Sequence, residues 1–320
     1  FGHPGDARLN TELSENARAF AVTAALKGLR IAQIGPRCEA MAGTWVEELR
    51  LSAQLGASIV PVSAHRLAQE AAGIGSQLVA GFINDLKERY RVLGVSDRSL
   101  EHAARASLAV GTVAEREGCE AVAIEDLDPE LHRLLKTRPC LWVPGLRERG
   151  VVVGMENDVL ATLGMWFVRR LGESTPMYTE IFTFDQEANC LLLGHAGMLD
   201  PELAGANEVT LIPDAEYEAS DEVEGAWLHF SARPGPVTAV NLFAAAGAYR
   251  LTCFRGEALP VTDKLAGFAH ALVQVETPLE KFFERAGGLG MTQHFALSYD
   301  GIGGRLAKLC RILKLEYAEL

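Results

Sequence analysis

An α/β domain followed by a mainly antiparallel β domain is the fold that this sequence predicts. Up to residue 171, short apolar runs alternate with segments of helical periodicity, which is typical of a parallel sheet covered by helices. Residues 172–176 (GESTP) break this pattern, and short β-like runs separated by turns dominate beyond them. We therefore expect a Rossmann-like α/β domain over residues 1–174 and a barrel-like β domain over residues 175–320.

In the first domain, strands and helices follow from the apolar periodicity. Short apolar runs predict strands at 29–34, 57–63, 120–124, 140–144 and 151–155. Apolar residues three and four positions apart predict helices at 12–27, 44–55, 76–93, 97–117, 129–135 and 158–171. The run after the first strand, GPRCEAMAG, contains neither G-x-G-x-x-G nor the P-loop pattern, so the sheet is not expected to hold a nucleotide.

The second domain is expected to consist mainly of short strands. These are predicted at 177–184, 190–193, 208–212, 227–231, 236–243, 249–256 and 294–298. Helices are expected at 279–285 and 304–315, and the AHALV run around His270 also looks helical.

Composition limits the partners and the cellular compartment. The chain has 30 Lys+Arg against 42 Asp+Glu, a net charge of −12, which argues against nucleic acid or an anionic membrane as partner. No apolar run reaches the ~18 residues of a membrane span, and no secretory signal is visible. The cysteines form no C-x-x-C pair and several lie in apolar surroundings, which predicts buried thiols in the cytoplasm.

Carboxylates and histidines at the ends of expected strands are the candidate functional residues. Glu156 and Asp158 follow the apolar run VVVGM, at the strand end where α/β proteins place their sites. Glu180 lies within the run YTEIFTF, where burying a charge is costly unless it is paired or bound to metal. His195 and His294 each border a β-like run. Taken alone, either histidine is also compatible with a structural role, and Glu180 with a solvent-facing position.

Four segments of the chain resemble the L-fucose/L-arabinose isomerase-like family. Residues 180–198 resemble the matching segment of L-arabinose isomerases, with the sequence EIFTFDQEANCLLLGHAGM. Residues 156–172 resemble the preceding E-x-D and helix of both isomerases, with ENDVLATLGMWFVRRLG. Residues 287–316 resemble the C-terminal part of fucose-isomerase-like proteins, with GGLGMTQHFALSYDGIGGRLAKLCRILKLE. Residues 18–41 are similar to the beginning of the family's central domain, with RAFAVTAALKGLRIAQIGPRCEAM.

The resemblance covers the central and C-terminal domains of that family. Its members usually carry a further N-terminal α/β domain, of which residues 1–28 resemble only the trailing edge. The chain also begins with Phe1 rather than Met. We therefore expect either a piece or processed form of a longer protein or a naturally shorter relative.

The resemblance also implies a set of site residues. Glu156 and Glu180 would be paired catalytic carboxylates and metal ligands, His294 would complete the metal shell, and His195 would be an additional ligand. Asp158 ranks lower as a partner of the ligands, and Asp185 is an alternative if the register of the strand differs. A mixed carboxylate and imidazole shell suits Mn²⁺ best, with Co²⁺ or Mg²⁺ as alternatives.

The expected function is a metal-dependent aldose–ketose isomerase that acts through an enediol on a pentose or 6-deoxyhexose, of the L-arabinose or L-fucose type. The proton at C2 of an aldose is weakly acidic, so the reaction needs a cation beside the carbonyl oxygen and a carboxylate to move the proton. The substrate is a small sugar, and the resemblance implies a homo-oligomer. The alternatives are a non-catalytic sugar-binding protein on the same scaffold and an epimerase or aldolase that forms an enediolate.

Overall fold

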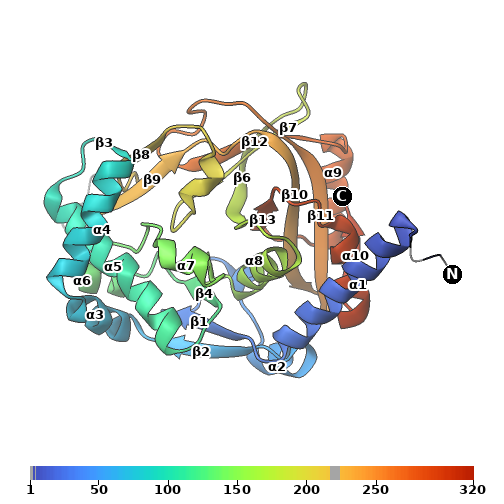
Figure 1. The fold of residues 1–320 in the computed structure, drawn as a ribbon, viewed down its shortest axis with the longest axis horizontal. Helices are drawn as coiled ribbons and strands as arrows, with labels where there is room; N and C mark the ends of the chain where they lie inside the picture. Colours follow the sequence, from blue (N-terminus) through green and yellow to red (C-terminus); the bar gives the residue numbers. More distant parts are fainter. Residues whose placement is uncertain (1–2, 4, 217–223) are drawn as a thin grey trace.

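The computed structural model describes residues 3, 5–216 and 224–320 (Figure 1). Within these residues the strands form sheets of four, seven and three strands. The four-stranded sheet is entirely parallel and has the order β2-β1-β4-β5. Its strands are β1 (Arg30–Ile34), β2 (Ser58–Val62), β4 (Ala121–Ile124) and β5 (Val152–Gly154). The parallel sheet and its helices confirm the predicted α/β class, and the Rossmann-like detail stays a prediction.

The seven-stranded sheet occupies the second half of the chain and has the order β10-β13-β6-β7-β12-β11-β14. Strand β10 also pairs with β11, so the pairings of six strands form a closed cycle. Every pairing is antiparallel except β11 with β14. The cycle supports the barrel-like shape, which stays a prediction. The strands are β6 (Met177–Asp185), β7 (Cys190–His195), β10 (Gly235–Ala245), β11 (Ala248–Leu259), β12 (Ala269–Val275), β13 (Phe295–Ser298) and β14 (Glu316–Glu319).

A small third sheet joins the two halves of the chain. Strand β3 (Arg91–Val92) comes from the first half and pairs in parallel with β8 (Val209–Pro213). Strand β8 then pairs with β9 (Ala226–Phe230) in antiparallel register. The hydrogen bonds between β3 and β8 thereby link a segment of the first half of the chain to a segment of the second half.

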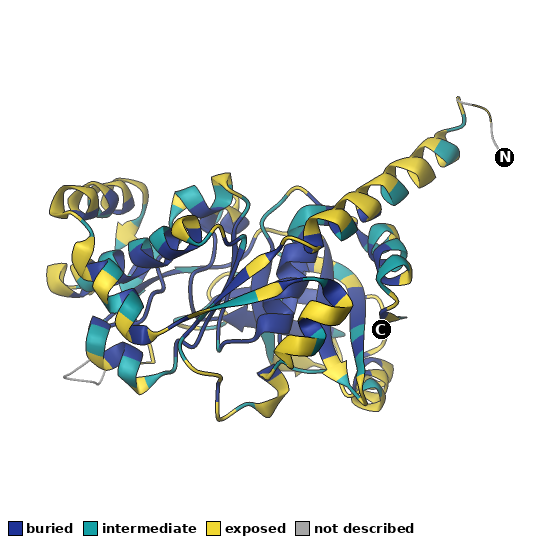
Figure 2. Ribbon diagram, turned by 90° about the horizontal axis from the view of Figure 1, so that it is seen from below, coloured by how far each residue is buried: buried dark blue, intermediate teal, exposed yellow. Residues whose placement is uncertain are grey.

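The helices lie around the parallel sheet and along the outer side of the larger one (Figure 1). The first, α1, packs on α10, and its N-terminal end extends beyond the body of the molecule (Figure 2). None of the helices in the described part of the chain is both long and apolar enough to cross a membrane. They are α1 (Ala7–Leu26), α2 (Glu48–Leu55), α3 (Ala64–Gly73), α4 (Ser76–Arg89), α5 (Asp97–Arg116), α6 (Pro129–Leu135), α7 (Pro144–Glu148), α8 (Val159–Leu171), α9 (Leu279–Leu289) and α10 (Gly303–Leu313), with short 3₁₀ turns at Ala42–Thr44 and Pro201–Ala204.

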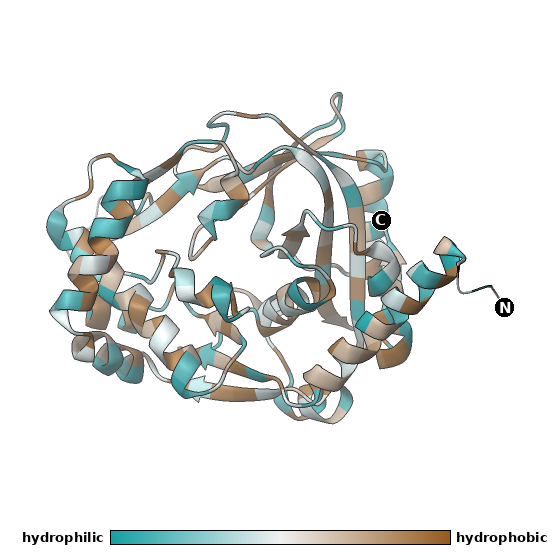
Figure 3. Ribbon diagram, viewed as in Figure 1, coloured by the Kyte–Doolittle hydropathy of each residue, from teal (hydrophilic) through white to brown (hydrophobic). Residues whose placement is uncertain are grey.

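Helix α8 connects the two larger sheets. It packs against β4 and β5 on one side and against β10 and β13 on the other, so its residues are buried almost throughout. Apolar residues therefore run around much of its surface, as expected for a helix inside a core (Figure 3). Trp166 is fully buried, and its Nε1 donates a hydrogen bond to Glu120 at 2.8 Å. The core is continuous from the parallel sheet through α8 into the β region.

Three predictions of local structure are wrong in whole or in part. The helix predicted at 76–93 ends at Arg89, and residues 91–92 form strand β3 because they pair with β8. Residues 140–144 form no strand: they are a buried segment that leads into α7, where Pro144 occupies the first turn because it needs no backbone N–H partner there. The run around His270 is strand β12, not a helix, and it pairs with β7. A short apolar run does not distinguish the two structures by periodicity, and pairing with a neighbouring strand decides. The cysteines are buried and free, as predicted.

Candidate active site

Glu156 lies in a sharp turn at the carboxyl end of β5. Its φ is 55° and that of Asn157 is 51°, so both residues adopt the left-handed conformation, which is costly for residues other than glycine. Hydrogen bonds from the neighbouring strand β4 hold the turn: the Glu156 N–H donates to Asp126 Oδ1 at 2.9 Å, and the Asn157 N–H donates to the Ile124 carbonyl oxygen at 2.8 Å. The turn places the Glu156 side chain at the edge of the parallel sheet.

Close packing of α8 against β5 also shapes this turn. A Cβ at Gly154 would lie 2.1 Å from Thr162 Oγ1, so only glycine allows the helix to approach so closely. Asp158 is the N-cap of α8, and its Oδ1 accepts a hydrogen bond from the Ala161 N–H at 2.9 Å. Glu156 and Asp158 are therefore fixed relative to the start of the same helix.

His294 directly precedes β13 and is fully buried. Its Nδ1 lies 2.9 Å from Asp158 Oδ2 and donates a hydrogen bond to that carboxylate. The bond fixes the ring orientation, and in the neutral ring it leaves the lone pair of Nε2 free on the opposite side. Nε2 lies 2.9 Å from Glu156 Oε2.

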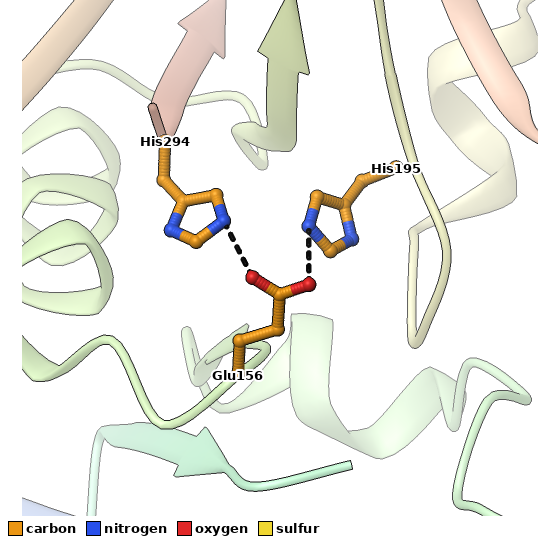
Figure 4. Close-up of side chains that lie close together, drawn as sticks. All are labelled: Glu156, His195 and His294. Carbon is orange, nitrogen blue, oxygen red and sulfur yellow. Dashed lines mark ion pairs between the residues drawn. The ribbon is translucent and has the colours of Figure 1, made fainter. Parts of the chain in front are cut away.

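His195 is the last residue of β7 and is 4% exposed. Its Nδ1 donates to the neighbouring Ala196 carbonyl oxygen at 2.9 Å, so its Nε2 is also left without a proton in the neutral ring. This Nε2 lies 3.8 Å from Glu156 Oε1. The two imidazoles thus approach the Glu156 carboxylate from different strands (Figure 4).

The side chains of Glu156, His195 and His294 offer ligand atoms that all lie within 4.8 Å of one another. His195 Nε2, His294 Nε2 and Glu156 Oε2 are buried and have no hydrogen-bond partner of acceptable geometry. Buried polar atoms rarely remain unpartnered, and two imidazole nitrogens with a carboxylate are suitable ligands for a divalent transition metal. The cluster therefore fits a metal ion. In the described part of the chain, no other group of three His, Cys, Asp or Glu converges in this way.

Strand β6 lies between the two strands that carry the histidines. Thr179 pairs with Phe295, next to His294, and Glu180 pairs with Gly194, next to His195. Glu180 therefore lies level with both histidines along the sheet. Its side chain is half-buried and is not among the three that converge within 4.8 Å.

Tyr178 shares a face of β6 with Glu180, because alternate residues of a strand point to the same side. Its ring centroid lies 4.8 Å from that of His195 and 4.9 Å from that of His294. Its hydroxyl donates to the Met155 carbonyl oxygen at 3.1 Å. The fully buried ring therefore packs against both imidazoles, which also contact each other edge to face with their ring centroids 5.4 Å apart.

The charges at the site shift its pKa values in opposite directions. Burial disfavours the charged form of Glu156, but the neighbouring His294 and His195 outweigh it and lower the pKa of this carboxyl. Burial raises the pKa of Glu180, and the negative charge of Glu156 raises it further. Burial lowers the pKa of His195, assisted by His294. Burial also opposes protonation of His294, but Asp158 and Glu156 prevail and raise its pKa to about 9.

The remaining candidates from the sequence lie in different surroundings. Asp158 is hydrogen-bonded to a histidine of the cluster, as described above. Asp185 is the exposed last residue of β6, and its Oδ1 accepts hydrogen bonds from the N–H groups of Glu187 and Ala188 at 3.0 and 2.9 Å. The structure does not bring Asp185 to the cluster. Asp126 is not among the residues that the sequence patterns mark, although it lies two residues after the strand predicted at 120–124 and so at the same sheet edge as Glu156.

Comparison with known proteins gives relatives over almost the whole chain. No family model matches it. It is 23% identical over 317 residues to a sulfoquinovose isomerase of Priestia megaterium, covering 99% of this chain and 70% of that protein. A sulfoquinovose isomerase of Alkalicoccus urumqiensis is 22% identical, with 100% and 71% covered. An L-arabinose isomerase of Mycolicibacterium smegmatis is 25% identical over 263 residues, which are 78% of this chain and 51% of that protein. These relatives are all named sugar isomerases, and they support an arabinose/fucose isomerase-like family for this chain.

Proposed function

We propose that this protein is a metal-dependent isomerase that interconverts an aldose and its ketose through an enediol. The observation that carries the proposal is the convergence of the Glu156 carboxylate with the Nε2 atoms of His195 and His294. All three groups are largely buried, and the converging atoms lack hydrogen-bond partners. The sugar isomerases among the relatives support the same reaction class.

Glu156, His195 and His294 would hold the metal ion, with Glu180 as a fourth ligand from the neighbouring strand. Mn²⁺ is the ion we propose, with Co²⁺ and Mg²⁺ as alternatives, because imidazole nitrogens bind transition metals more readily than Mg²⁺. When bound, the ion would act as a Lewis acid that stabilises negative charge on the substrate oxygens.

The two carboxylates are suited to different roles because their pKa values are shifted apart. The two imidazoles lower the pKa of Glu156, so this carboxylate stays ionised. Partial burial and the negative charge of Glu156 raise the pKa of Glu180, so its carboxylate accepts a proton more readily. We assign the proton transfer to Glu180: its carboxylate takes the proton from C2 of the aldose and returns it to C1, while the hydroxyl proton passes from O2 to O1. Tyr178 keeps the imidazoles oriented toward Glu156.

Two substrate classes are candidates. The sequence predicts a pentose or 6-deoxyhexose, and one relative is named an L-arabinose isomerase. The sulfoquinovose isomerases cover a larger share of the chain, which favours sulfoquinovose, a 6-deoxyhexose with a sulfonate at C6, as the second candidate.

The proposal includes the organisation of the protein. Glu156 belongs to the domain of residues 1–174, and Glu180, His195 and His294 belong to the domain of residues 175–320, so the site lies where the two meet. We further propose a cytoplasmic homo-oligomer, whose subunit number can be measured by size-exclusion chromatography with light scattering.

A substrate panel tests the proposal. Purified protein is stripped with a chelator, reloaded with Mn²⁺, Co²⁺ or Mg²⁺, and incubated with L-arabinose, L-fucose or sulfoquinovose, and the products are identified by NMR. We expect conversion of an aldose to its ketose, lost in Glu156→Gln and Glu180→Gln. Binding without turnover would support the sugar-binding alternative instead, and a C2 epimer or cleaved sugar would support the epimerase or aldolase.

A further inference from the structure

A buried ion-pair network lies behind the Glu156 turn. The guanidinium of Arg138 and the carboxylates of Asp126 and Asp214 are each 1% exposed. Arg138 donates two hydrogen bonds to Asp214, at 2.6 and 2.9 Å, and a third to Asp126 Oδ2 at 3.2 Å. The network joins Asp126, two residues after the end of β4, to Asp214, the residue that follows β8.

Asp126 connects this network to the metal cluster. Its Oδ2 faces Arg138, and its Oδ1 accepts the backbone N–H of Glu156 at 2.9 Å. Both oxygens of the carboxylate therefore act as acceptors, and rotation of the side chain would break both contacts. The guanidinium thus fixes the direction in which Asp126 presents an oxygen to Glu156.

We propose that Asp126, held by Arg138, is a positioning residue that keeps Glu156 in the left-handed conformation from which its carboxylate meets His195 and His294. The inference rests on the proposed metal site and names the residues that shape it. Glu156 has no favourable backbone conformation of its own at a φ of 55°, so the turn depends on hydrogen bonds from its surroundings. Among the hydrogen bonds described above for this turn, the one to Asp126 is made by the backbone N–H of Glu156.

The same network offers a matched control. Asp214 is equally buried and accepts hydrogen bonds from Nε and Nη2 of the same guanidinium, whereas Asp126 accepts from Nη1. Substitution of either aspartate disturbs a buried ion pair and destabilises the fold. Only the loss of Asp126 removes the acceptor of the Glu156 N–H.

The test is a titration of the metal-free protein with Mn²⁺ alone, with free Mn²⁺ followed by EPR and no sugar present. We expect Asp126→Ala to raise the Kd for Mn²⁺ about 10- to 100-fold, the range typical of groups that orient metal ligands. Asp126→Asn should fall between that variant and the wild type, because its one oxygen can face either Arg138 or Glu156 but not both. Asp214→Asn should lower the melting temperature and leave the Kd close to the wild-type value.

The outcomes separate this inference from the proposed function. Wild-type protein that binds no Mn²⁺ and isomerises no sugar would contradict the proposed function itself. Wild-type protein that binds Mn²⁺, with equal affinity in folded Asp126→Ala, would overturn the positioning role alone, as would an Asp214→Asn variant that is weakened as much. If circular dichroism shows that only Asp126→Asn folds, wild-type affinity in that variant overturns the inference.

Discussion

Asp158 begins helix α8 and also orients His294, through a hydrogen bond of 2.9 Å between its Oδ2 and the imidazole Nδ1. Its other oxygen caps the helix through the Ala161 N–H. One side chain therefore couples the position of a helix in the core to the direction in which an imidazole presents its second nitrogen. A substitution of Asp158 should therefore affect both the stability of helix α8 and the orientation of His294.

Asp158→Ala should lose both roles. Loss of the cap should lower the free energy of unfolding by about 1 kcal/mol, and loss of the histidine partner should weaken Mn²⁺ binding about 10- to 100-fold. Urea denaturation and a Mn²⁺ titration measure the two effects. Ser96→Ala is the control, because Ser96 caps α5 in the same way, accepting from the Ser99 N–H at 3.0 Å. Equal loss of Mn²⁺ affinity in both variants would contradict a specific role for Asp158.

Mn²⁺ should stabilise the wild-type protein against heat, and His294→Gln should abolish most of this gain. A ligand at 100 times its Kd adds about 2.7 kcal/mol to the stability of the state that binds it. The measurement is the melting temperature with Mn²⁺ and with a chelator. His270→Gln is the control, because the buried His270 has partners for both nitrogens, Phe268 and Lys264 among them. A Mn²⁺-induced rise that survives in His294→Gln would exclude this histidine as a ligand.

Tyr178 allows the role of its ring to be separated from that of its hydroxyl. Tyr178→Phe removes only the hydrogen bond to the Met155 carbonyl oxygen and should cost about 1 kcal/mol of stability with turnover largely retained. Tyr178→Ala removes the ring that packs against both imidazoles and should cost about 3–5 kcal/mol, with a marked fall in kcat. Equal kcat values for the two variants, measured on folded protein, would show that the ring does not orient the histidines.

Asp300 should make the stability of the protein depend on pH in the acid range. Burial alone would raise the pKa of its carboxyl, but hydrogen bonds from Ser174 and Glu173 outweigh burial and lower it. A pKa that is lower in the folded state stabilises the fold above the unfolded value of about 4 and ceases to do so as pH falls through the folded value.

Asp300→Asn should therefore be less stable than the wild type at pH 7, by about 1 kcal/mol for a partly exposed group, and the difference should shrink below about pH 4. Urea denaturation at several pH values measures this. The exposed Asp85→Asn serves as control and should leave the profile unchanged. A constant difference between Asp300→Asn and wild type at all pH values would contradict the assignment.

Much of the site could be predicted from the sequence because its residues stand next to strong local signals. Glu156 follows an apolar run, and His195 and His294 border β-like runs, so each could be placed at a strand end. The resemblance to the isomerase family, carried by the same segments, is confirmed by the relatives, as is the reaction class. The seven predicted strands of the second half all correspond to strands of the structure.

Other features depend on side-chain directions that no local pattern encodes. Asp126 and Arg138 acquire their roles only when a guanidinium from one loop meets carboxylates from two others, and nothing near either residue signals that meeting. The segment 140–144 looks like a strand because it is apolar, yet it is buried without pairing to a neighbour. The position of β12 likewise depends on β7, which comes much earlier in the chain.

The pairing of β6 with both β7 and β13 bears on when the site forms during folding. Glu156 and His294 are 294 − 156 = 138 residues apart, and the strand that follows His294 pairs with β6, which lies soon after Glu156 in the chain. Contacts of such long sequence separation form late because the loop between them must first be closed. A chain still being synthesised that has not reached residue 294 lacks one member of the cluster. Tight binding of a metal ion would therefore begin only after this part of the chain is made and folded.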